Sequence, residues 1–344
     1  MDNHLHIVAF DNPFPPIYGG VIDIFYKIEA LSKAGIKIHL HLFSSNENID
    51  VELQNKCVEI YIYKRNKNIS NQLSTLPYIV KSRCSGLLFK NLSKDNFPIL
   101  FEGLHTTYTL FANPSLAHRS IIRHHNIEHE YYKGLYQSSD TIFSKIYYLI
   151  ESIKLRNYLK QIPSVHCHLS ITENDSNYFK NIGLKNVITV PPFHSTSSPT
   201  ETIINSQEDK FVLYHGNLNV SENLKAAKFL IKHIFTRNNI KYVIAGSLKT
   251  NTSSLLKIKN KSVRIITNPT SQEIGELIQS AQVIVLPTFQ STGIKLKLID
   301  SLYKGKHVIT NEKMVEGFPL PELVSIAKSN NEFMEDRKST RLNS

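Results

Sequence analysis

Short apolar runs alternate with amphipathic stretches along the first part of the chain. Residues 5–10 and 36–43 are rich in Val, Ile, Leu and Phe, and between them every third residue from Ile22 to Ala34 is apolar, up to Gly35. Such runs predict buried parallel strands, and the repeat predicts a helix that ends at the glycine. Strand, helix and strand at this spacing form a βαβ unit, which implies a parallel sheet with a right-handed crossover.

The same pattern returns in the second half of the chain. Strands are predicted at 211–215, 241–246, 263–266 and 282–287, and helices at 221–234 and 273–281. Residues 194–202 are rich in Ser, Thr and Pro, which is typical of a linker. We therefore predict an α/β protein with two Rossmann-like domains, 1–193 and 211–335, joined by a linker at 194–210. Each would hold a doubly wound parallel sheet, with a central cleft between the carboxyl ends of the strands.

The composition is that of a globular protein with enough residues for two cores. The chain has 344 residues, of which 41% are hydrophobic and 20% are charged. It has no apolar run long enough to cross a membrane, and its first residues lack the pattern of a secretory signal. Its three cysteines, Cys57, Cys84 and Cys167, are scattered, which indicates reduced thiols rather than a zinc site or disulfides. We expect a cytoplasmic protein.

The formal net charge of +11 could attract nucleic acid, an anionic membrane or phosphate-bearing substrates. The positive charge occurs in both halves, and the sequence has no Arg-rich arm, zinc finger or RNP-type motif, so we expect no nucleic-acid partner. Small phosphate compounds and peripheral contact with the inner face of the cell membrane stay open. Four tyrosines permit membrane contact, although a place in the core or on a helix face is commoner: Tyr131, Tyr132, Tyr147 and Tyr148.

Two junctions between a strand and a helix carry glycines that suit phosphate binding. Gly19 and Gly20 precede the first helix, where they let the backbone approach a ligand and aim amide N–H groups at an anion. A tight turn without a ligand is the alternative. The pair is not the GxGxxG fingerprint, which disfavours a nicotinamide dehydrogenase.

At the second junction, the strand at 282–287 leads through a polar loop to Gly293, where a helix is predicted to begin and to run up to Gly305. The positive end of this helix suits a diphosphate, and Lys295 or Lys297 could add a second charge. Asp300, about two turns into the helix, could accept hydrogen bonds from ribose hydroxyls. A solvated helix face is the alternative for each lysine.

Residues 293–300, G-I-K-L-K-L-I-D, resemble the donor-binding signature of family 4 glycosyltransferases, whose bacterial members carry G-I-[KR]-x-K-x-x-E. Asp300 takes the place of the usual glutamate. The family's other acidic position falls at Thr292, so the contact to the sugar departs from the family pattern. The resemblance implies the GT-B fold, in which two Rossmann-like domains face a cleft. It also implies a retaining transfer from a nucleoside-diphosphate sugar, without a metal or another cofactor.

Other stretches agree with this resemblance. Gly216 and Asn217, with Asn223 nearby, resemble the loop that meets the donor phosphates in the second domain. His105 follows a predicted strand at 99–102, where family members carry a histidine beside the transferred sugar; a satisfied loop histidine is the alternative. The block R-x-H-N-x-E follows a predicted strand at 120–122, and its residues would shape the acceptor side or lock the first domain: Arg123, His125, Asn126 and Glu128.

The resemblance assigns these residues to three groups. The catalytic residues would be His105, Lys297 and Asp300. The donor would be bound by Gly216, Asn217, Gly293, Ile294, Lys295, Lys297 and Asp300. The acceptor side of the cleft would be formed by Gly19, Gly20, Arg123, His125, Asn126 and Glu128. The acceptor would be a glycan or a lipid-linked sugar in envelope or exopolysaccharide synthesis.

Two alternatives stay open. A sugar-nucleotide epimerase of the same fold would need cleft carboxylates on the first domain, for which Glu102 and Glu128 are available. The second is a truncated chain that binds nucleotide but is inactive, because it would lack the final helix that in this fold crosses back to brace the first domain. Residues 336–344 are identical to the in-frame translation of a common sequencing adaptor. We therefore expect the second domain to be truncated at residue 335 and the natural protein to continue with other residues.

Overall fold

The computed structural model divides the chain into two compact units, Met1–Ser195 and Thr196–Ser344. It describes residues 3–16, 19–139, 141–194, 210–236, 240–248, 255, 260–289, 296–318 and 320–333. Of the predicted linker, only residues 194 and 210 belong to this described part. Each unit has its own hydrophobic core around a parallel sheet.

The first unit contains a seven-stranded parallel sheet with the order β3-β2-β1-β4-β5-β6-β7. Its strands are β1 (His4–Ala9), β2 (Lys37–Phe43), β3 (Glu59–Tyr63), β4 (Ile99–Glu102), β5 (Ser120–His124), β6 (Cys167–Ser170) and β7 (Val187–Thr189). The order reverses between β1 and β4, so the connections that leave these two strands diverge and open a crevice at their carboxyl ends. Residues that follow β1, β4 and β5 therefore meet at one edge of the sheet.

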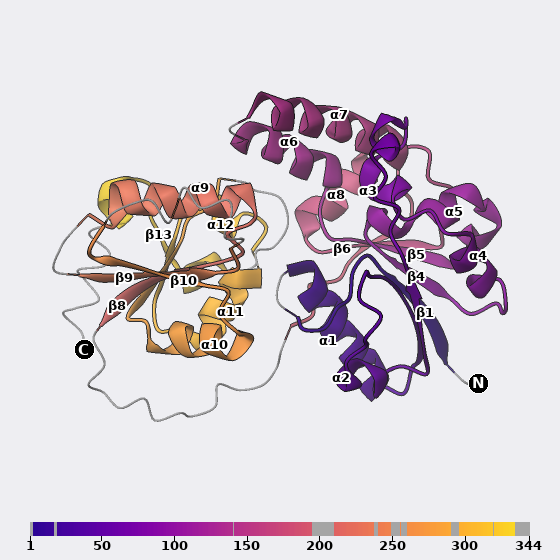
Figure 1. The fold of residues 1–344 in the computed structure, drawn as a ribbon, viewed down its shortest axis with the longest axis horizontal. Coiled ribbons are helices and arrows are strands. Elements are labelled where there is room, and N and C mark those ends of the chain that lie inside the picture. Colours follow the sequence, from indigo (N-terminus) through magenta and orange to yellow (C-terminus); the bar gives the residue numbers. More distant parts are fainter. Residues whose placement is uncertain are drawn as a thin grey trace. The chain divides into compact units, whose positions relative to one another are not determined.

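Eight α-helices are described in the first unit. They are α1 (Gly19–Lys33), α2 (Val51–Gln54), α3 (Tyr78–Lys81), α4 (Gly86–Leu92), α5 (Tyr108–Ala112), α6 (Glu128–Ser138), α7 (Ile142–Leu159) and α8 (Glu173–Asn181). The helix predicted before Gly35 is α1, and Gly35 has φ +81°, which favours glycine after a helix end. Helices α6 and α7 lie side by side as a hairpin (Figure 1).

Only part of the apolar repeat lies on the buried face of α1. Phe25 and Ile28 are buried together with Val21 and Ile24, whereas Ala34, after the helix end, is exposed. Because an α-helix has 3.6 residues per turn, a repeat of three residues drifts around it.

The second unit contains a six-stranded parallel sheet with the order β10-β9-β8-β11-β12-β13. Its strands are β8 (Phe211–His215), β9 (Lys241–Gly246), β10 (Val263–Thr267), β11 (Val283–Leu286), β12 (Val308–Thr310) and β13 (Ser325–Ile326). Its α-helices in the described part are α9 (Ser221–Phe229), α10 (Ser271–Ser280), α11 (Leu296–Lys304) and α12 (Glu312–Val315). Helix α9 covers one face of this sheet and α10 and α11 cover the other (Figure 1). The prediction of two parallel-sheet α/β domains is thus confirmed.

Two glycines bring the ends of neighbouring strands together in the second unit. A Cβ atom on Gly246, at the end of β9, would lie 1.8 Å from the carbonyl oxygen of Gly216, directly after β8. Only a residue without a side chain fits there. The loop after β8 is therefore held against the end of β9, at the carboxyl edge of the sheet. In neither unit is any described helix long and apolar enough to cross a membrane.

Candidate functional site

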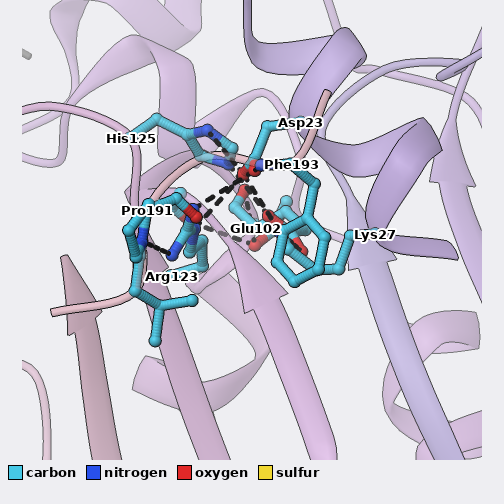
Figure 2. Close-up of polar contacts among 10 residues, drawn as sticks. Asp23, Lys27, Glu102, Arg123, His125, Pro191 and Phe193 are labelled. Atoms are coloured by element: carbon cyan, nitrogen blue, oxygen red, sulfur yellow. Dashed lines mark hydrogen bonds and ion pairs between the residues drawn. The ribbon is translucent and has the colours of Figure 1, made fainter. Parts of the chain in front are cut away.

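Five ionisable side chains meet at the carboxyl edge of the first sheet (Figure 2). Asp23 and Lys27 come from α1, Glu102 from the end of β4, Arg123 from β5 and His125 from the loop that follows. All five are at most 8% exposed. We call this group the ion cluster. Arg123 lies within β5 itself, which corrects the prediction that the strand ends at residue 122.

Every charge of the ion cluster has a partner of opposite sign. Lys27 Nζ donates to Asp23 Oδ2 (3.1 Å) and to Glu102 Oε1 (2.8 Å). Arg123 holds both oxygens of Asp23 at 3.2 Å, and His125 Nε2 lies 2.9 Å from Glu102 Oε2. Burial raises the pKa of Asp23 and of Glu102, but the nearby positive charges outweigh it and lower the pKa of both carboxyls. Both are therefore ionised at neutral pH.

The ion cluster also binds the backbone at the end of the first unit. Arg123 donates to the carbonyl oxygens of Val190 (2.6 Å) and Pro191 (3.1 Å). The amide of Phe193 donates to Asp23 Oδ1 (2.7 Å). Arg123 and His125 were expected either to shape the acceptor side or to lock the first domain. These contacts fit the second role, because they connect α1, β4, β5 and residues 190–193.

The contacts of the ion cluster argue against two other functions for these residues, metal binding and epimerase catalysis. Asp23, Glu102 and His125 offer convergent ligand atoms, within 4.8 Å of one another, that could hold a metal ion. The Lys27 ammonium, however, contacts both carboxylates and supplies the charge that a cation would bring. Glu102 is fully buried and paired, so it does not fit the free cleft carboxylate that an epimerase would need.

A second group of residues lies next to the ion cluster. Gly20 packs so closely on Phe10 that a Cβ atom would lie 2.6 Å from the ring. The Phe10 ring is 5.0 Å from the His105 ring and 5.5 Å from the His125 ring. The fold thus brings together Gly20, His105 and His125, which the sequence analysis placed on the sugar and acceptor side. Gly19 begins the same turn of α1.

Two groups near this point have buried polar atoms without a hydrogen-bond partner in the described part of the chain: His105 Nδ1 and Glu128 Oε1. Burial lowers the pKa of His105 well below its usual range, so the ring is neutral at pH 7. Burial raises the pKa of Glu128 to about 7, against opposing effects of a hydrogen bond with Asn126 and the charge of Arg83. A buried polar atom without a partner is costly, so a ligand that formed a hydrogen bond with either of these two groups would gain from it.

In the second unit the predicted donor residues converge on one side chain, Asn223. Lys297 Nζ, in the first turn of α11, donates to Asn223 Oδ1 (2.9 Å), and Asn223 Nδ2 donates to the carbonyl oxygen of Asn217 (3.0 Å). A Cβ atom on Gly216 would lie 3.5 Å from the Asn223 amide. Lys297 also lies over the ring of Tyr214, 5.2 Å from its centre. Gly293, Ile294 and Lys295 lie outside the described residues.

Asp300 sits further along α11 and is 41% exposed. It pairs with Lys304 at 2.8 Å, so a ribose would have to share or replace this partner.

Sequence reasoning missed His215, the last residue of β8, which lies 2.7 Å from Ser301 Oγ of α11. Burial, followed by the charge of Lys297, lowers the pKa of His215 to about 4, so it is a neutral link between β8 and α11.

Asp23 and Lys27 were also missed by sequence reasoning. Their signal was present: an acid and a base lie four residues apart among the apolar residues Ile24 and Ile28. Charged residues on the buried side of an amphipathic helix need a buried partner. The pair is therefore a usable sign of an ion cluster, although its partners on β4 and β5 could not be named from it.

The second unit matches a model of a known protein family. Residues 209–334 match the family model "Glycosyl transferases group 1". A Klebsiella pneumoniae protein described as "Uncharacterized 44.6 kDa protein in cps region" is 27% identical over 330 residues. The match covers 90% of this chain and 83% of that protein.

Solved structures share the fold at low sequence identity. Sucrose-phosphate synthase from Thermosynechococcus elongatus superposes with a TM-score of 0.73 at 12% identity, covering 99% of this chain and 90% of the synthase. Anabaena HepE, solved in complex with UDP and glucose, superposes with a TM-score of 0.64 at 12% identity, covering 98% and 90%. At such identities the likeness establishes the fold alone, and the predicted two-domain GT-B fold is confirmed.

We predict that Lys27→Met destabilises the protein by about 3–5 kcal/mol, because it leaves two buried carboxylates with fewer partners. Urea unfolding followed by circular dichroism measures the loss. Lys33→Met is the matched control on the same helix: Lys33 is 73% exposed and pairs with Glu29, so its loss should stay below about 1 kcal/mol. Equal losses in the two variants would contradict the assignment of the ion cluster as a lock.

We predict a pH-dependent effect of Glu128→Gln on stability. The folded protein keeps the Glu128 proton up to about pH 7, whereas the unfolded chain releases it near 4.5. The contribution of this carboxyl to the free energy of unfolding is full below 4.5 and is lost as the pH rises through about 7. An uncharged glutamine avoids this loss, so the stability of Glu128→Gln relative to the native protein should grow by up to about 3 kcal/mol between about pH 5 and pH 8.

The measurement is urea unfolding of both proteins across this pH range. Glu130→Gln is the control, because Glu130 lies in the first turn of the same helix but is 39% exposed. Its difference from the native protein should stay constant. A constant difference for Glu128→Gln as well would show that the buried carboxyl does not hold its proton.

Proposed function

We propose that this chain is a glycosyltransferase of the GT-B type; the match of residues 209–334 to the group 1 glycosyltransferase model and the shared fold support this. A sugar passes from a nucleoside-diphosphate donor to a glycan or lipid-linked acceptor, with retention of the anomeric configuration. The relative from a cps region supports a place in polysaccharide biosynthesis. The Anabaena neighbour, solved with UDP and glucose, supports a nucleotide-sugar donor.

The observation that carries this proposal is the contact between Lys297 and Asn223. It holds an ammonium group beside the loop of Gly216 and Asn217, at the carboxyl end of β8. Nucleotides bind open α/β sheets at this edge. The position of Lys297 therefore suits the diphosphate of a donor, with the backbone of the Gly216 loop beside it.

Charge develops on the diphosphate as the bond to the sugar breaks. Lys297 would stabilise this charge, together with the backbone N–H groups of Gly293 and Ile294 and the side chain of Lys295, which keep the roles expected for them. Asp300 would bind the ribose after exchanging part of its contact with Lys304. We expect no metal in this step, because a preorganised ammonium group and amide dipoles provide the positive potential.

The first unit would bind the acceptor and the transferred sugar. A neutral His105 can exchange hydrogen bonds with a sugar hydroxyl through Nδ1, which has no other partner among the described residues. Glu128 and Asn126 lie after β5 at the same sheet edge, and Gly19 and Gly20 begin the helix that follows β1. Arg123 and His125 would act on this surface indirectly, by holding the loops in place.

Thermal denaturation with UDP, GDP, ADP and their sugars, with and without Mg²⁺, tests the donor assignment. One of the diphosphates should stabilise the protein, by about 2.7 kcal/mol at a hundredfold excess over its Kd. Removal of Mg²⁺ should leave this stabilisation unchanged. A folded protein that is stabilised by none of the compounds would overturn the proposed donor site.

We predict that Lys297→Ala costs about 2–4 kcal/mol of transition-state stabilisation, because one preorganised positive group is lost. This corresponds to a fall in kcat/KM of about 30-fold to 900-fold in a sugar-transfer assay. Lys306→Ala is the control, since Lys306 is an exposed lysine just after α11 and should keep near-native turnover. Near-native turnover of Lys297→Ala would remove Lys297 from the diphosphate site.

A further inference from the structure

Helix α7 (Ile142–Leu159) exposes a row of large apolar side chains along its outer face. Six residues are between 43% and 88% exposed: Ile142, Phe143, Ile146, Leu149, Ile150 and Ile153. Most are three or four residues apart, so they share one side of the helix. We call this row the α7 stripe. Single exposed apolar residues are common on proteins, but a continuous row of six marks a surface that contacts something.

The other side of α7 is anchored in the core of the first unit. Leu155, Tyr158 and Leu159 are buried there, and Tyr158 Oη lies 2.9 Å from Thr107 Oγ1. The carboxylate of Glu151 accepts a hydrogen bond from the amide of Tyr78 (2.6 Å). The helix is thus fixed in its orientation, and the exposure of the α7 stripe is a property of the fold.

The exposed charges of α7 itself are basic, and the exposed Glu130 of the neighbouring α6 pairs with Lys133. Glu151 is the one acidic residue in the helix, and it is buried and paired with Lys154 at 2.9 Å. The exposed charged residues are Lys145, Arg156 and Lys160, the residue that caps the helix. An apolar face flanked by basic side chains is typical of helices that lie in the headgroup region of anionic membranes.

A hollow of about 270 Å³ adjoins the end of the α7 stripe. It is lined by the basic residues Arg156 and Lys160 and by Leu159, Tyr178 and Ile182. Two cationic side chains together with apolar ones suit a lipid phosphate whose acyl chains lie alongside. A second copy of this chain fits less well, because in a symmetric contact each copy would bring the same basic residues.

We propose that the α7 stripe docks on an anionic lipid surface, with its apolar side chains in the headgroup region and Arg156 and Lys160 on lipid phosphates. This names a surface different from the four tyrosines considered from the sequence. Of those, Tyr132 is buried and the other three are partly buried. Docking does not depend on the donor chemistry, so it can be tested without a sugar-transfer assay.

Flotation of the full chain with vesicles tests the proposal. The protein should bind vesicles of phosphatidylcholine with phosphatidylglycerol, and bind vesicles of phosphatidylcholine alone much less. Ile146→Gln/Ile150→Gln should weaken binding to the anionic vesicles at least about tenfold, and Arg156→Gln/Lys160→Gln should weaken it and reduce its salt dependence. Val51→Gln/Leu87→Gln is the control, since both residues are exposed and apolar but lie on α2 and α4; it should bind like the native protein.

A second measurement does not depend on any loss of binding. The chain contains no Trp, so Phe143→Trp introduces a single tryptophan, whose emission can be excited selectively, into the α7 stripe. Its emission should shift to the blue with anionic vesicles. The proposal would be overturned if the Ile146→Gln/Ile150→Gln variant bound vesicles like the native protein, or if the Trp emission did not change. It would also be overturned if the native protein were a dimer and this variant a monomer, because the α7 stripe would then contact a second copy.

Discussion

The pairing of Asp23 with Arg123 is the interaction on which the first unit depends. Burying an unpaired carboxylate or guanidinium would cost several kcal/mol, so α1 and β5 can pack closely only if these two groups meet. Lys27 and His125 extend the pairing to Glu102 on β4, and Arg123 also holds the carbonyl groups of Val190 and Pro191. The loops around the sheet edge are therefore positioned by one neutralised network.

This network separates two kinds of polar residue at the same sheet edge. The charges of the ion cluster are fully used in holding the fold, whereas His105 and Glu128 each keep a buried atom without a partner among the described residues. In the second unit the neutral side chain of Asn223 has a positioning role like that of the ion cluster. Its amide contacts Lys297 and the loop of Gly216 and Asn217. In both units the positioning residues are closely packed and leave other groups to meet the ligand.

The three surfaces discussed above lie on different elements. The donor contacts involve β8, α9 and α11, and the sugar and acceptor side involves the ends of β1, β4 and β5. The α7 stripe is exposed on the second helix of the α6–α7 hairpin. Each can be altered by substitutions that leave the packing of the others intact. Membrane docking of α7 and a lipid-linked acceptor would be consistent with each other, since both place the first unit at a lipid surface.

The parallel α/β architecture, the strands β8 and β9 at their full length and the end of α1 before Gly35 could be predicted from the sequence. They follow from apolar spacing and from turn residues close together in the chain. The sequence also pointed to the glycine loop and to Lys297. The packing of distant elements decided that Asp23 meets Arg123 a hundred residues away, that Arg123 holds loops in place while Glu128 Oε1 has no partner among the described residues, and that the apolar stripe of α7 is exposed. The physical reason is that burial and charge pairing depend on which distant elements pack together, whereas a local pattern records only which side chains are apolar.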